Sequence, residues 1–202
     1  MINYGEELTY WFLRLNGFFP VTDFVMHPGN QVDYLTDCDV LAVRPPYVTE
    51  DVGGNPGDWH PRFAPFIQAG DYIGVVGQSK INQCANFTRF DVGYLEYAIA
   101  RLGMFRDHRA AAAGLQCAAG HTTSQGVTVV ALLVAQPPLP QGNFIGLSLQ
   151  DIRAFIRSRM MTYDSVKYPN KHFFPSALIQ NLIDEVHHGR EPRAVGDVRV
   201  FN

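Results

Sequence analysis

The sequence predicts an α/β domain in which a mixed central β-sheet is flanked by helices, with extra helices at the carboxyl end. Three observations support this class. The chain opens with a helical pattern that is followed by strand-like segments rich in β-branched and aromatic residues. Residues 126–136 are nearly all apolar, which is typical of a strand in the middle of a sheet. Helical patterns occur between and after these strands, as in sheets covered by helices.

Residues 6–15 are predicted to form the first helix. Four large apolar residues recur at the i, i+3, i+4 and i+7 positions of this segment: Leu8, Trp11, Phe12 and Leu15. This spacing places them on one face, which we expect to pack against the sheet. The pair Asn16-Gly17 then predicts the helix end, because both residue types accept the left-handed conformation of a C-cap.

The next segments alternate between strands and connections. Residues 18–26 predict a strand with a break at Pro20. Residues 27–30 (HPGN) predict a turn, and residues 38–44 (CDVLAVR) a second strand. The stretch 45–70 is rich in Pro, Gly and Asp, so we expect one long loop of the kind that often carries function.

The middle of the chain completes the sheet. Residues 72–78 (YIGVVGQ) predict a third strand, and residues 91–103 predict a helix. The alanine run at 110–113 indicates a further short helix, and the apolar segment 126–136 is the fourth strand. Together with the first helix, this gives the order helix, three strands, helix, strand.

Two more helices are expected after a Pro/Gly-rich hinge. The first covers about residues 149–160, with Ser148 and Asp151 in a capping arrangement. The second covers about residues 175–187, and a polar tail begins at His188. We therefore divide the chain into a core at 1–136 and a helical extension at 137–202 that packs on the same domain.

The composition is that of a globular protein. The chain has 202 residues, of which 47% are hydrophobic and 17% charged, enough apolar material for one substantial core. We find no apolar run of the about 20 residues that span a bilayer. The amino terminus carries acidic residues where a signal peptide has basic ones, so we expect a cytoplasmic protein.

Charge is distributed unevenly along the chain. The net charge is −3, but residues 1–71 carry −7 and residues 72–202 carry +4. An acidic half suits a cation and a basic half suits a polyanion. Ordinary variation of surface charge is an equally good interpretation.

Three polar residues at strand positions form a candidate catalytic cluster. Asp39 interrupts an apolar strand, and Gln78 and Lys80 stand at the end of the next strong strand. Residues two apart on a strand point to the same side, so Gln78 and Lys80 are expected together, with Asp39 beside them if the strands are neighbours. An acid, an amide oxygen and an ammonium suit Mg²⁺-assisted hydrolysis of a phosphodiester. Ordinary polar residues at a solvated strand end are the alternative.

The order of elements, with Asp39 on one strand and Gln78-Ser79-Lys80 on the next, resembles the PD-(D/E)XK superfamily of restriction-endonuclease-like nucleases. The resemblance covers about residues 5–136 and includes Glu6, which precedes Gly17-Phe18 as a helical glutamate does in the resolvase-like branch. The segment also resembles a group of uncharacterised bacterial proteins. The resemblance implies an αβββαβ core.

The resemblance also implies roles for individual residues. Asp39 matches the metal-binding aspartate, Lys80 the lysine that orients the attacking water, and Gln78 the position of a second metal-binding acid. Ser79 would add its carbonyl oxygen to the Mg²⁺ (or Mn²⁺), and Glu6 would act through a bound water, with Glu7 as its substitute if the helix register differs by one. Nucleic acid, DNA in particular, is the implied partner, and a homo-oligomer is kept open.

Two departures from the family pattern concern activity. Gln78 replaces the usual acid and removes one negative charge, although some branches use QxK, and Cys38 stands where proline usually precedes the aspartate. The sequence therefore keeps two main hypotheses. One is a Mg²⁺-dependent DNA nuclease, and the other is an inactive nuclease-like fold that binds nucleic acid or protein. A plain structural partner protein is a third.

A helical arginine cluster is a separate candidate for phosphate binding. Arg153, Arg157 and Arg159 fall near one face of the predicted helix 149–160. A solvated helix face is the alternative interpretation.

Overall fold

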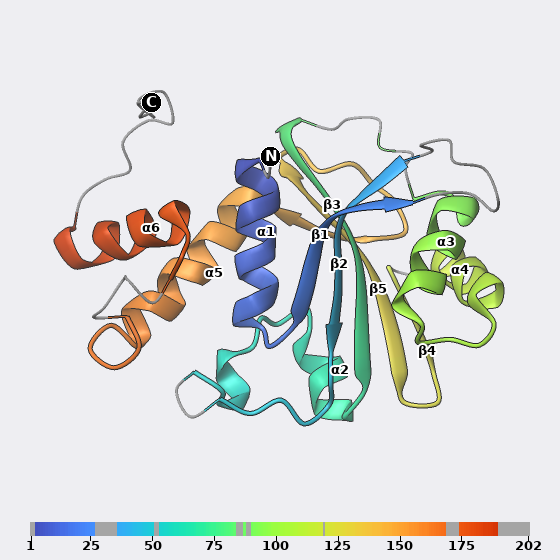
Figure 1. Cartoon of the computed structure of the whole chain (residues 1–202), viewed down its shortest axis with the longest axis horizontal. Coiled ribbons are helices and arrows are strands. Elements are labelled where there is room, and N and C mark those ends of the chain that lie inside the picture. Colours follow the sequence, from blue (N-terminus) through green and yellow to red (C-terminus); the bar gives the residue numbers. More distant parts are fainter. Residues whose placement is uncertain are drawn as a thin grey trace.

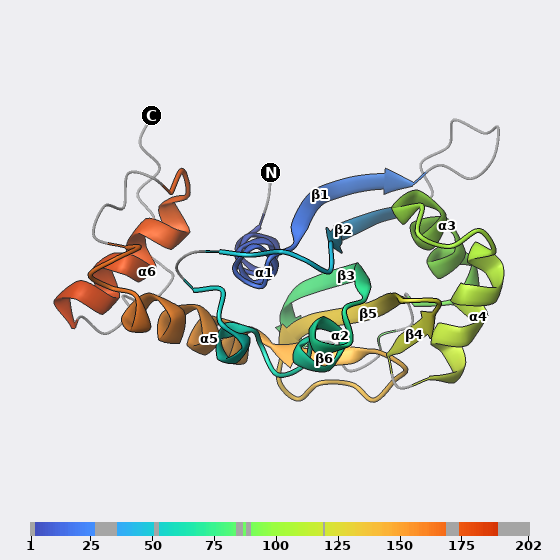
Figure 2. The same ribbon diagram turned by 90° about the horizontal axis from the view of Figure 1, so that it is seen from below.

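The computed structural model describes residues 3–26, 36–50, 53–83, 87, 90–118, 120–168 and 174–189. Over these residues the chain forms an open, mixed, six-stranded β-sheet with helices on both faces (Figures 1 and 2). The predicted α/β class is confirmed. The elements in chain order are α1 (Tyr4–Leu15), β1 (Phe19–Met26), β2 (Thr36–Arg44), η1 (Pro56–Asp58), α2 (Ala64–Ala69), β3 (Tyr72–Gln83), α3 (Val92–Leu102), α4 (His108–Cys117), β4 (His121–Ser124), β5 (Val127–Gln136), β6 (Ile145–Ser148), α5 (Leu149–Thr162) and α6 (Ala177–His188).

Helix α1 begins two residues earlier than its apolar pattern indicates, because Asn3 caps it. The Asn3 side chain accepts hydrogen bonds from the N–H groups of Gly5 and Glu6, and the Asn3 N–H donates to the Glu6 carboxylate. The helix ends at Asn16 as predicted, and Gly17 follows with a φ of +80°.

The sheet has the strand order β1-β2-β3-β5-β4, and β6 also pairs with β5. Strands β1, β2 and β3 are antiparallel, whereas β3 and β5 run parallel. Parallel neighbours need a crossover connection, and α3 and α4 supply it. Strand β5 pairs on both sides and is almost entirely buried, so the predicted central strand at 126–136 is confirmed.

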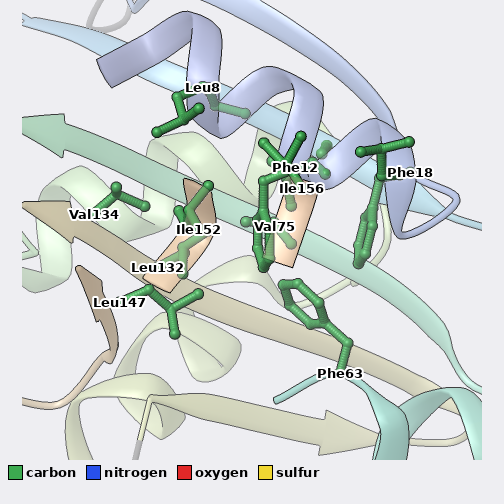
Figure 3. Packing of buried hydrophobic residues seen from close by; sticks show 14 of the residues in the cluster. Leu8, Phe12, Phe18, Phe63, Val75, Leu132, Val134, Leu147, Ile152 and Ile156 are labelled. Atoms are coloured by element: carbon green, nitrogen blue, oxygen red, sulfur yellow. The ribbon is translucent and has the colours of Figure 1, made fainter. Parts of the chain in front are cut away.

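Two apolar clusters hold the helices on the sheet. Helices α1, α5 and α6 cover one face, and α3 and α4 cover the other (Figure 2). On the first face, Leu8 and Phe12 of α1 meet Ile152 and Ile156 of α5 over Val75 of β3 (Figure 3). The two C-terminal helices therefore share their core with α1 and the strands.

Strand β1 differs from the expectation at Pro20. The strand is continuous there, and Pro20 pairs with Ala42. A proline is tolerated because β1 lies at the edge of the sheet, where a missing N–H costs no ladder bond. The irregular residue is instead Asp23, which has a φ of +54°.

The predicted loop at 45–70 is wrong in part, because it contains η1 and α2. Helix α2 has six residues, fewer than a periodicity window needs, and it ends at Gly70 with a φ of +76°. Strands β4 and β6 were not predicted for the same reason, since each has four residues. Strand β3 runs to Gln83 rather than ending at residue 78, so Ser79 and Lys80 lie within it.

The remaining helices agree with the sequence. The α5 capping box of Ser148 and Asp151 is present, and Ser176 caps α6. The predicted turn at 27–30 and the tail beyond Gly189 lie outside the described residues. In the part of the chain that is described, none of the helices has the length and apolarity required to traverse a lipid bilayer.

Candidate active site

The regular main-chain pairing between β2 and β3 ends next to Asp39. The two strands pair in register from Arg44 opposite Ile73 to Val40 opposite Gly77. Beyond that point the Ser79 N–H donates to the Asp39 side chain, with 2.7 Å between nitrogen and Oδ2. The carboxylate thus replaces a main-chain acceptor and satisfies an N–H that would otherwise be buried without a partner.

Asp39 and Lys80 form an ion pair across the two strands. Lys80 Nζ lies 3.2 Å from the same Oδ2 atom. Asp39 is 5% exposed, whereas the Lys80 side chain is 34% exposed. A buried carboxylate needs such compensation, and charge-assisted hydrogen bonds are the stronger kind. The structure therefore brings together two of the residues that the sequence singled out.

Glu6 lies within electrostatic range of this pair. Partial burial raises the pKa of the Glu6 carboxyl, and the charges of Asp39 and Asp23 raise it further, while the hydrogen bond from the Asn3 main chain and the charge of Lys80 lower it. Its Oε2 accepts the bond from the Asn3 N–H at 2.9 Å. The capping role therefore fixes Glu6 at the helix end that is near the ion pair.

The amino-terminal end of α1 rests closely on β3. A Cβ atom built at Gly5 would lie 2.6 Å from Ser79 Oγ and 3.1 Å from Ile81 Cγ2. Ser79 is 2% exposed, and its hydroxyl has no hydrogen-bond partner among the described residues. Only glycine permits this approach, which places the first turn of α1, and Glu6 with it, beside the strand.

Gln78 is tied to α3, which covers the face of the sheet opposite α1. It is fully buried, and its Nε2 lies 2.8 Å from the Tyr94 hydroxyl of α3 and 3.3 Å from the main-chain oxygen of Asp37. We expected the side chains of Asp39, Gln78 and Lys80 to converge. The structure shows direct contact between Asp39 and Lys80. The amide nitrogen of Gln78 bonds toward α3.

The sequence did not identify Asp23 or Tyr94. Asp23 lies on β1 between the pairs Thr22–Val40 and Phe24–Cys38, which puts it opposite Asp39. The signal that marked Asp39, an acid inside an apolar strand, is also present in FPVTDFVM. No sequence pattern indicated Tyr94, because a tyrosine on the apolar face of a helix usually belongs to the hydrophobic core.

The donor atoms near the ion pair suit a hard cation in part. Over the described ranges, no group of three or more His, Cys, Asp and Glu side chains is placed to hold a metal ion. The oxygen donors expected from the sequence are the Asp39 carboxylate, the Ser79 carbonyl and the Gln78 amide oxygen. Mg²⁺ accepts such oxygens, commonly uses one or two carboxylates and keeps several waters. Both contacts to Asp39 use Oδ2, so Oδ1 accepts no hydrogen bond from the described residues.

The arginine cluster of α5 is used inside the molecule. Arg153 and Arg157 both bind Glu185 of α6, at 2.7 Å and 3.0 Å. Arg159 is 4% exposed and donates to the main-chain oxygens of Gly53 and Asp58. Arg153 and Arg157 are thus partly exposed but paired with Glu185, whereas Arg159 is buried, so the three arginines do not form one solvated helix face.

Comparisons with protein-family models, with curated proteins and with solved structures found no match to this chain.

Proposed function

We propose that this protein is a metal-dependent phosphodiester hydrolase of the PD-(D/E)XK type, and that its substrate is DNA. The observation that carries the proposal is the Asp39–Lys80 ion pair, which joins neighbouring strands at a break in their ladder. Glu6 of the first helix is in electrostatic range of both.

The topology supports a restriction-endonuclease-like core. One helix precedes three antiparallel strands, and a helical crossover then leads to a strand parallel to the third. The αβββαβ order that the sequence resemblance implies would correspond to these elements, with α2, α4 and the short strand β4 as additions. In such a core, Asp39 on β2 would be the metal-binding acid and Lys80 on β3 would be the lysine of the motif.

The residues of the site would divide the work. Asp39, the Ser79 carbonyl and the Gln78 amide oxygen would hold Mg²⁺ or Mn²⁺, which polarises the phosphate and lowers the pKa of a bound water. Lys80, partly exposed beside Asp39, can orient the attacking water and offset developing charge. Glu6, with its raised pKa, can accept a hydrogen bond or a proton from a water at the rim.

A second function is favoured by Gln78. This residue is fully buried, and its amide nitrogen is held by the Tyr94 hydroxyl and by a main-chain oxygen. With Gln in place of an acid, the site has one carboxylate fewer for a cation. A nuclease-like module that binds nucleic acid or protein without cleaving is therefore the alternative.

Cleavage of plasmid and single-stranded DNA in Mg²⁺ or Mn²⁺ tests the proposal. We expect activity in the parent, with a loss of at least about 100-fold in Lys80→Ala and Asp39→Asn, the usual range for removing a group that acts in the transition state. Asp71→Asn is the matched control. Asp71 is also a buried acid of this sheet, and it accepts a bond from Thr128 at 2.6 Å at the other end of β3.

The outcomes separate the two functions. Equal activity in Lys80→Ala and the parent would exclude the assigned site. A parent that binds DNA in a gel-shift assay but cleaves no DNA or RNA would support the binding module instead.

A further inference from the structure

We infer that Tyr94 is a positioning residue that fixes the orientation of the Gln78 amide, and that this position is built for an amide rather than for the acid usual in such sites. The inference rests on the proposed function where it concerns cation binding. The part that concerns the orientation of the amide rests only on the contacts of Gln78.

The orientation of the amide follows from the chemistry of its neighbours. A side-chain amide nitrogen carries two N–H donors. One faces the main-chain oxygen of Asp37 at 3.3 Å, which is an acceptor only, and the other faces the Tyr94 hydroxyl at 2.8 Å. Turning the amide over would set two oxygens against each other, so the nitrogen end is fixed toward α3 and the oxygen end away from these two groups.

Tyr94 is itself held in place. It is 6% exposed within the apolar cluster under α3, together with Cys38 and Val76. Burial, and after it the neighbouring Cys38 thiol, raise the pKa of the Tyr94 hydroxyl. The Cys38 sulfur lies 3.3 Å from the Val40 oxygen and 3.6 Å from the Gly77 oxygen. This cluster holds the hydroxyl against β2 and β3 at the level where their regular pairing ends.

A carboxylate at position 78 would be unfavourable in these surroundings. It would have no N–H for the Asp37 oxygen, and it would bring a second negative charge beside Asp39 into a fully buried position. Burying a second negative charge beside Asp39 costs far more than burying an amide whose two N–H groups are both paired. Gln78→Glu is nearly isosteric and restores the usual acid of the motif, but we expect it to destabilise the protein.

The first test measures stability by urea unfolding at pH 7.5 in EDTA, without any metal. We expect Gln78→Glu to lower the folding equilibrium constant at least tenfold. Tyr94→Phe should lower it about tenfold in the parent but less than threefold in a Gln78→Met background, because the lost bond is then already absent. Tyr97→Phe, a partly exposed tyrosine of the same helix, is the control and should change little.

A second test needs no destabilised variant. The Gln78 side-chain NH₂ should exchange slowly with solvent in NMR spectra of the parent, and at least tenfold faster in Tyr94→Phe but not in Tyr97→Phe. A Gln78→Glu protein as stable as the parent would overturn the claim that the position is built for an amide. Equal effects of Tyr94→Phe in both backgrounds, or unchanged NH₂ exchange, would overturn the positioning role.

A third test addresses the cation. The Mg²⁺ concentration that gives half of the rise in Tm should increase at least threefold in Tyr94→Phe and stay unchanged in Tyr97→Phe. A purely structural tyrosine would lower Tm without moving that concentration, and this result would overturn the role in cation binding. If the Tm of the parent does not respond to Mg²⁺, the proposed function and the cation half of the inference fail, while the two metal-free tests still decide the amide orientation.

Discussion

Asp39 illustrates how much one side chain determines in this protein. Its Oδ2 accepts both the Ser79 N–H and the Lys80 ammonium, and the residue is almost completely buried. The first contact maintains the sheet, and the second supplies the proposed chemistry. A substitution at Asp39 that removes the charge but keeps a hydrogen-bond acceptor therefore tests the proposed chemistry apart from the structural role.

We predict that Asp39→Ala destabilises the protein by about 1–3 kcal/mol, because the Ser79 N–H and the Lys80 ammonium both lose their acceptor. Asp39→Asn should lose less, since its amide oxygen still accepts the Ser79 N–H. Urea unfolding in EDTA measures both. Equal losses in the two variants would contradict the hydrogen-bonding role of the carboxylate.

Glu6 gives a prediction about pH. Because its folded-state pKa lies above the ordinary value of 4.5, folding favours the protonated acid. That contribution is complete below the ordinary pKa and is lost as the pH rises through the raised one. Glu6→Gln keeps a capping side chain but does not titrate.

The stability of Glu6→Gln relative to the parent should therefore increase between pH 4 and pH 7. We expect a gain of about 0.3–0.5 kcal/mol, kept small because solvent screens a carboxylate that is only partly buried. Urea unfolding across this pH range measures it. A relative stability that falls with rising pH would mean that the carboxylate is stabilised in the folded protein.

At the level of elements, the contact between α1 and β3 positions the candidate site. Gly5 allows the helix to approach Ser79, and the Asn3–Glu6 capping box fixes the first turn. Apolar packing of Leu8 and Phe12 holds the rest of the helix (Figure 3). The helix can thus present Glu6 to a pair of strands that lie far from it in sequence.

We predict that Gly5→Ala destabilises the protein by about 1–3 kcal/mol, because the new methyl group would overlap the Ser79 hydroxyl. Ser79→Ala alone should be nearly neutral, since it removes a buried hydroxyl that has no partner among the described residues. The double variant should recover most of the loss. Thermal unfolding of the three proteins tests this, and an additive double variant would place the clash elsewhere.

For the whole molecule, helix α5 holds the segment between β2 and β3 in place. Arg159 of α5 donates to the Gly53 and Asp58 oxygens, and the Tyr163 hydroxyl donates to the Asp58 carboxylate at 2.7 Å. Arg44 lies over the Trp59 ring, 4.8 Å from its centre. The segment is therefore attached to both the sheet and α5.

We predict that Arg159→Met lowers stability by about 2 kcal/mol and exposes the segment around residues 53–58 to proteases, because a buried and a half-buried carbonyl oxygen lose their donor. Arg101→Met, on the exposed last turn of α3, is the control. Limited proteolysis with mass spectrometry locates the cuts. Unchanged cleavage in Arg159→Met would show that other contacts hold the segment.

Local spacing was sufficient to determine the α/β class, the main strands and most helix ends. The apolar period of α1, the all-apolar run of β5 and the Ser148–Asp151 cap are readable because the residues involved lie within a few positions of one another. The same spacing also selected Asp39 and Lys80, since polar residues in apolar strands are conspicuous. It could not resolve α2, β4 and β6, which are too short to show a period.

Only the tertiary structure decided which polar groups meet. Gln78 bonds to Tyr94, sixteen residues away on another element, and Asp23 lies opposite Asp39 through strand register. The arginines of α5 bind Glu185 and main-chain oxygens. Such pairings depend on register and on the packing of distant elements, and spacing along the chain carries no information about either.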